Sequence, residues 1–184
     1  MDGPSCPPRR LPSGAEPPDL GAGEETATIL ELKMNRALEW TRWLCVSLGV
    51  FLAFWHQGNP QKAFSLLTLL VVLGLAGLTA LESLFFSKGA RERSGYQGGG
   101  AYQRQSGFNN LATVAACLVV YAAGWGTQAK AAVMCVLLFF LAFSALNHAW
   151  SALREGNRSL QNLLRPALTA VLWAFVIPFM LAAL

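Results

Sequence analysis

The segment Ala131–Trp150, AAVMCVLLFFLAFSALNHAW, is apolar or small from its first residue to Leu146 and closes with the polar pair Asn147-His148. A helix needs roughly 20 such residues to cross a hydrocarbon layer about 30 Å thick. The length and composition of this segment therefore predict a membrane-spanning helix rather than a core helix of a soluble protein.

The composition of the whole chain points the same way. Of its 184 residues, 54% are hydrophobic and 13% are charged, whereas soluble domains carry about 25% charged residues. Similar apolar segments lie on both sides of the first one. We therefore predict an all-α integral membrane bundle of five transmembrane helices. The predicted spans cover about residues 37–55, 63–86, 108–125, 131–150 and 165–184.

The chain begins with a segment of different character. Residues 1–27 are rich in Pro and Gly and contain no apolar run, so they cannot bury enough surface to offset the entropy of ordering. We expect a disordered N-terminal tail over 1–27, followed by one transmembrane domain over 28–184. Thr28 and Glu31 have the spacing of a capping box, which predicts that helical structure starts near Thr28.

The links between the predicted spans are also informative. The residues from 87 to 107 are polar and Gly-rich, which predicts a loop. The link Gly126–Lys130 is short, so the third and fourth spans should be antiparallel neighbours. Gly156 is a suitable left-handed stop for the fourth span, and Pro166 suits the first turn of the fifth.

The second span contains three small residues, Gly74, Gly77 and Ala80. Small side chains let membrane helices approach closely. The ordinary use of Gly and Ala in membrane helices explains them equally well.

Basic residues predict how the chain is threaded. With five spans, all of the 14 Lys and Arg except Lys62 and Lys130 fall on the side of the N-terminus. Because Lys and Arg favour cytoplasmic loops, the N-terminus should be cytoplasmic and the C-terminus on the opposite side.

Several polar residues gather near the predicted cytoplasmic ends of the spans, and they are the candidates for a polar pocket. These residues are Glu82, Asn109, Asn110, Asn147, His148, Asn157 and Arg165. A pocket of this kind could bind a small solute or relay protons. Alternatively, Glu82 reaches interfacial water or pairs with Lys88, and the asparagines form structural hydrogen bonds between helices. On the outer side, the polar residues are expected only in turns exposed to water.

No pattern for catalysis stands out from these residues. We find no pairing of a nucleophile with a base, no phosphate-binding loop and no ligand spacing for a metal, so we expect no cofactor. The basic residues flank spans and give no reason to expect nucleic acid. The expected partners are the lipid bilayer and either other membrane subunits or further copies of the chain. Three functions stay open, namely a structural or accessory subunit of a membrane complex, a small-solute or proton-coupled carrier, and a membrane-embedded enzyme.

The segment 106–112, SGFNNLA, followed by Asn147-His148 and Gly156-Asn157, resembles a group of small bacterial and archaeal multi-pass membrane proteins. That group is defined as a domain of unknown function. The resemblance covers about residues 80–184 and carries over Asn110, His148 and Asn157. It implies a fold and a membrane location but no activity. The chain departs from the pattern at Arg165, where the group has an Asp before the proline of the last span.

Overall fold

The computed structural model describes residues 22–86, 100–154, 156 and 159–184, and all regular elements in these ranges are helices. The all-α prediction is confirmed. The elements are α1 (Ala22–Trp55), α2 (Pro60–Val71), the π-helix η1 (Val72–Gly77), α3 (Leu78–Phe85), α5 (Gly100–Ala122), α6 (Thr127–Arg154) and α7 (Leu160–Ala183).

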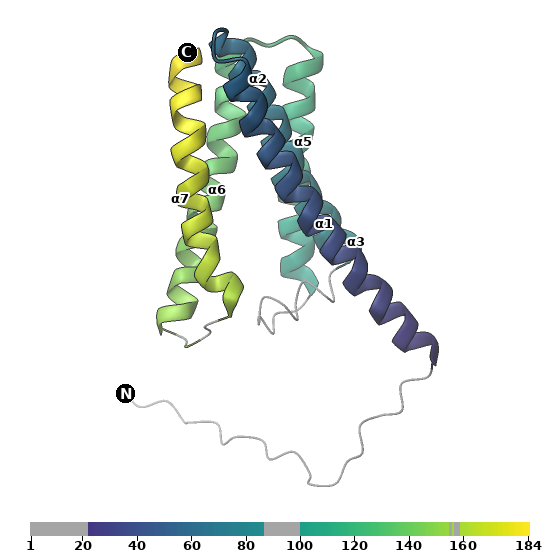
Figure 1. Ribbon diagram of the computed structural model, residues 1–184. Helices are drawn as coiled ribbons and strands as arrows, with labels where there is room; N and C mark the ends of the chain where they lie inside the picture. The colour runs from purple at the N-terminus through teal and green to yellow at the C-terminus, as the bar shows by residue number, and fades with distance from the viewer. Residues whose placement is uncertain (1–21, 87–99, 155, 157–158) are drawn as a thin grey trace.

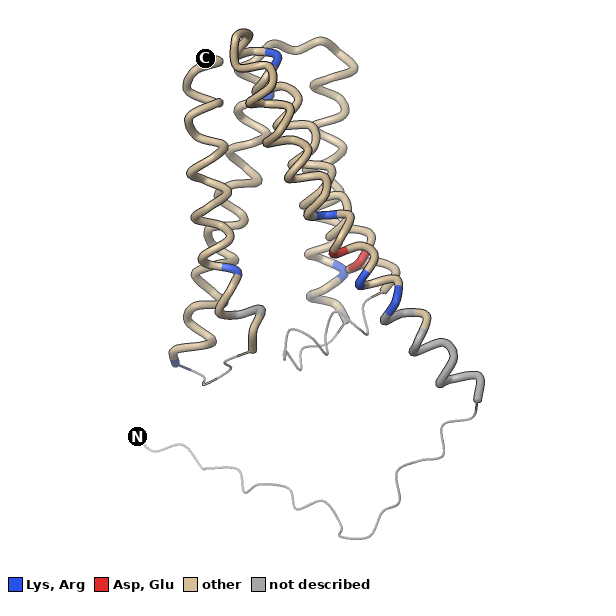
Figure 2. Tube along the Cα trace, viewed as in Figure 1, with Lys and Arg blue, Asp and Glu red and all other residues tan. Residues whose placement is uncertain are grey.

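The helices run up and down along one bundle (Figure 1). α2, η1 and α3 follow one another without a break and together form the second pass of the chain. α1 begins at one end of the bundle, here called the N-terminal end, and Leu184 lies at the other, the C-terminal end. Most of the described Lys and Arg residues lie toward the N-terminal end, as Figure 2 shows.

Short turns at the C-terminal end hold the passes antiparallel. Asn59 caps α2 by accepting a hydrogen bond from the Lys62 N–H at 3.0 Å, and Pro60 occupies the first turn of this helix, where no intrahelical donor is lost. Between α5 and α6, Gly124 takes a left-handed conformation with φ of 65°, which costs glycine little. The contact between α5 and α6 confirms the predicted antiparallel neighbours.

The centre of the bundle is the second pass. α2 packs against α1, α6 and α7, and η1 packs against α1 and α5. The largest fully buried apolar side chains come from this pass and from its neighbours α6 and α7. They are Phe64, Leu67, Val71, Val72, Met134, Leu137, Leu138 and Val176. The packing of these buried side chains holds the passes together. The outer faces of the bundle carry large exposed apolar residues.

Within the described residues, four helical segments are long and apolar enough to cross a membrane, as expected for a multi-pass integral membrane protein. They are Lys33–Trp55, Pro60–Phe85, Thr127–Arg154 and Leu163–Ala183. The predicted span at 108–125 is not among them. It corresponds to α5, in which Gln105, Asn109 and Asn110 lower the hydropathy of the first half.

Helix starts differ most from the sequence prediction. α1 starts at Ala22, so Thr28 lies within the helix and the predicted capping box is not at its start. The last proline before α1 is Pro18, and the residues from Ala22 onward include the good helix formers Ala and Glu. Residues 1–21, which make up most of the predicted tail, lie outside the described residues.

α5 and α7 also start earlier than predicted. α5 begins at Gly100, inside the predicted loop, because AYQRQ is a helix-forming sequence once the glycine run has ended. α7 begins at Leu160, so Pro166 lies inside the helix rather than in its first turn. Gly156 has a φ of 71°, which confirms the left-handed residue predicted after α6.

Candidate functional site

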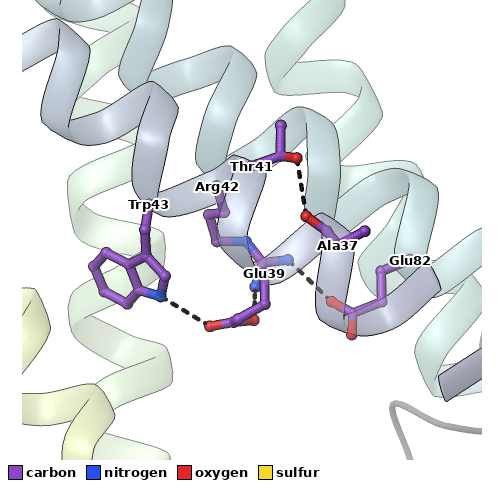
Figure 3. A network of polar contacts seen from close by, with 6 residues as sticks. All are labelled: Ala37, Glu39, Thr41, Arg42, Trp43 and Glu82. Carbon is purple, nitrogen blue, oxygen red and sulfur yellow. Dashed lines mark hydrogen bonds and ion pairs between the residues drawn. The ribbon is translucent and has the colours of Figure 1, made fainter. Parts of the chain in front are cut away.

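Arg42 on α1 forms ion pairs with two carboxylates (Figure 3). Its Nη1 donates to Glu39 Oε2 at 2.7 Å within α1. Its Nη2 donates to Glu82 Oε2 at 3.0 Å, which links α1 to α3. The side chains of Arg42 and Glu82 are each 13% exposed. A partly buried guanidinium thus joins two carboxylates from two passes of the chain.

Glu39 is held from a second side. Its Oε1 accepts a hydrogen bond from Trp43 Nε1 at 3.1 Å, while its Oε2 binds Arg42. Residues three and four apart lie on the same face of a helix, so the order of Glu39, Arg42 and Trp43 along α1 produces this arrangement directly. Both carboxylate oxygens of Glu39 are therefore engaged within the protein.

Close packing of α1 on the second pass brings Arg42 to Glu82. A Cβ added at Gly74 would lie 2.7 Å from the Cβ of Cys45, three residues after Arg42. That distance is too short for any side chain, so the predicted close approach of helices is confirmed at Gly74. At Gly77 the nearest atom would be 3.7 Å away, on Val114, which is an ordinary contact. Gly74 thus allows α1 and the second pass to approach closely beside Arg42.

A second polar pair joins α6 to α7. Arg165 Nη1 lies 2.8 Å from His148 Nε2, and His148 is buried. Because a guanidinium only donates hydrogen bonds, Nε2 accepts in this contact and the imidazole proton is on Nδ1. Two of the predicted pocket residues are thus brought together.

The asparagines among the predicted pocket residues take different positions. Asn110 is buried on α5, where its Nδ2 donates to the Ser106 carbonyl at 2.9 Å. Asn109 on α5 and Asn147 on α6 are exposed. Asn157 lies outside the described residues. The bond made by Asn110 stays within one helix, so it is not the link between helices that the alternative interpretation predicted.

The predicted pocket therefore divides into separate contacts. Glu82 lies on α3 with Arg42 of α1 as a partner, whereas His148 and Arg165 belong to α6 and α7. Lys88, the partner considered for Glu82 from the sequence, lies outside the described residues. Whether these residues together hold a solute stays a prediction.

The sequence prediction missed a polar cluster near the C-terminal end, where polar residues were expected only in turns. Lys130 Nζ donates to Ser65 Oγ at 2.9 Å and lies 4.6 Å from the centre of the Tyr121 ring. The Tyr121 hydroxyl donates to the Ser65 carbonyl. The cluster joins α2, α5 and α6. Lys130 was interpreted as part of a link, because nothing near it in the sequence indicates its contacts with Ser65 and Tyr121.

We also looked for groups of metal-binding side chains and for similar proteins. Within the part of the chain that the structure describes, no three His, Cys, Asp or Glu side chains lie close enough to hold a metal ion. No protein-family model, curated protein or solved structure matches the chain.

Proposed function

We propose that the chain is a five-span membrane protein that serves as a structural or accessory subunit of a membrane complex. Three observations support α5 as the fifth span. It has 23 residues and is about 34 Å long at 1.5 Å per residue, of which the less polar part from Phe108 to Ala122 makes up about 22 Å. It packs against α3, η1 and α6. It also returns the chain to the C-terminal end, from which α6 starts.

The distribution of charge supports the orientation. The starts of α1, α5 and α7 and the end of α6 lie at the N-terminal end of the bundle. With α5 as a span, this end receives Lys33, Arg36, Arg104, Arg154 and Arg165, while Lys62 and Lys130, at the starts of α2 and α6, belong to the other end. By the preference of basic residues for cytoplasmic loops, we place the N-terminal end of the bundle on the cytoplasmic side. The C-terminus is then on the opposite side.

The observation that carries the structural role is the way Arg42 is used. Ionisable side chains in membrane segments are costly, and they mark transport pathways when they face a cavity. Here Arg42 joins Glu39 and Glu82 across two helices, and Lys130 joins α6 to α2 and α5. Both cations therefore form contacts that link neighbouring helices. This use of charge favours a rigid subunit over a carrier that must rearrange its helices.

The carrier is the second candidate, and the contact between His148 and Arg165 favours it. Nε2 of His148 can accept from Arg165 only while it is unprotonated. Proton binding there would break the contact, which is a property that a proton-coupled carrier could use.

Affinity purification in mild detergent, applied to the wild type and to the Glu82→Gln and His148→Gln variants, tests the proposal. A structural subunit should bring down a stoichiometric membrane partner. Each variant should either keep that partner, or lose it and be present in the membrane at a lower level. A carrier should be purified without a partner, and its variants should insert normally while losing uptake of solute in vesicles.

A further inference from the structure

The surface of the middle part of α1 carries a depression of about 490 Å³, lined by Arg36, Glu39, Trp40 and Trp43. These residues are three or four positions apart, so they share one face of the helix. Trp43 donates its Nε1 hydrogen to Glu39, which fixes the position of its ring. The lining therefore combines two indole rings with a guanidinium.

Among the described residues, basic side chains outnumber carboxylates on this part of α1. In the described part of the chain, Glu39 is the only carboxylate that lines the depression, and its two oxygens bind Arg42 and Trp43. Arg36 is exposed, and so is Lys33, one turn closer to the start of α1. Among the described residues, both ion pairs belong to Arg42. Arg36 and Lys33 thus keep their charge available for an anion from outside the chain.

An exposed apolar stripe continues from the depression toward the C-terminal end. Trp40, Leu44, Leu48 and Phe51 are 68%, 67%, 48% and 58% exposed. Their spacing of three or four residues keeps them on one side of α1. The eleven residue steps from Trp40 to Phe51 rise about 16 Å, which is about half of a hydrocarbon layer roughly 30 Å thick. The stripe has the length of one leaflet.

We propose that this face of α1 binds an anionic glycerophospholipid of the inner leaflet. Arg36 and Lys33 pair with the headgroup phosphate, because guanidinium and ammonium groups are the natural partners of phosphate. Trp40 and Trp43 lie against the glycerol region, where indoles are favoured. One acyl chain follows the stripe from Leu44 to Phe51. The choice of the inner leaflet rests on the orientation given under the proposed function, whereas the choice of lipid class does not.

The test measures lipid binding by the full-length protein, purified and delipidated in detergent. Phosphatidylglycerol or phosphatidylcholine is added back and the bound lipid is measured by native mass spectrometry. The wild type should bind phosphatidylglycerol more tightly. Arg36→Gln should weaken phosphatidylglycerol binding about fivefold, which corresponds to about 1 kcal/mol per basic residue near an anionic lipid. Trp40→Ala should weaken the binding of both lipids.

Arg104→Gln is the matched control, because Arg104 is another exposed arginine near the same end of the bundle, on α5. It should leave lipid binding unchanged. Equal affinity of the wild type for the two lipids would overturn the proposal, as would an equal loss in Arg36→Gln and Arg104→Gln. Displacement of the lipid by millimolar inorganic phosphate would also overturn it, since the site would then recognise phosphate without the acyl chain. The measurement in detergent does not depend on orientation, so its failure is separable from a failure of the proposed threading.

Discussion

The two ends of the bundle stabilise a cation in different ways. At the N-terminal end, Arg42 binds the two carboxylates of Glu39 and Glu82. At the C-terminal end, Lys130 binds a neutral hydroxyl and lies over the ring of Tyr121. In the first arrangement a cation is balanced by carboxylates, so removing the cation or a carboxylate leaves the opposite charge without that partner. The second balances a single charge with dipoles and a ring quadrupole, so its removal leaves only neutral groups.

The largest effect is expected from removing the ion pairs of Arg42. Arg42→Met removes the cation shared by Glu39 and Glu82 and should lower the free energy of unfolding by about 3 kcal/mol, the lower part of the range for buried ion pairs. Glu82→Gln should cost less, because Arg42 keeps Glu39. Reversible unfolding in mixed detergent micelles measures both. The double variant Arg42→Met with Glu82→Gln should be more stable than Arg42→Met alone. Simple addition of the two losses would show that the residues do not interact.

A smaller effect is expected at Gly74, where α1 packs closely on the second pass next to Arg42. Gly74→Ala places a Cβ 2.7 Å from the Cβ of Cys45, and overpacking of this kind costs about 1–3 kcal/mol. Gly77→Ala is the matched control in the same π-helix, because its new Cβ meets nothing closer than 3.7 Å. Thermal unfolding in detergent should separate the two variants. If they lose the same stability, close packing at Gly74 is not what aligns Arg42 with Glu82.

The neutral end should respond more weakly. Lys130→Met removes one hydrogen bond to Ser65 and the contact with the Tyr121 ring. The expected loss is about 1 kcal/mol, since a typical hydrogen bond contributes about that much and no carboxylate is left without its cation. The same unfolding assay measures it. A loss as large as that of Arg42→Met would remove the distinction between the two ends.

The smallest effect is expected from Tyr121→Phe. This change deletes the hydroxyl that donates to the Ser65 carbonyl while keeping a ring beneath Lys130. A loss of about 0.5–1 kcal/mol is expected, below that of Lys130→Met. The reverse order would mean that the hydroxyl, and not the cation, holds α5 to α2.

Local patterns predicted the parts of this fold that depend on neighbouring residues. The apolar segment Ala131–Trp150 falls within α6, and Gly156 is the left-handed residue that follows it. The start of α5 was missed because a glycine run dominates the composition just before a helix-forming segment. The π-helix η1 was missed as well, since no local pattern distinguishes it from an ordinary helix with two glycines.

The partner of Glu82 could not be predicted from local patterns either. Arg42 is 40 residues away, and the pairing depends on the register that Gly74 allows between α1 and the second pass. Lys130 was assigned to a link for the same reason, because Ser65 and Tyr121 come from other helices. The sequence identified polar residues of interest at the N-terminal end, but which of them meet is decided by tertiary packing.

The central claim is that α5 crosses the membrane although its hydropathy is lower than that of the other four passes. Tags at Met1 and Leu184, probed in intact cells and again after permeabilisation, test it directly. Five spans place the two tags in opposite compartments, with Met1 reached only after permeabilisation and Leu184 reached in intact cells. Four spans place both tags in the same compartment, and that result would contradict the threading proposed here.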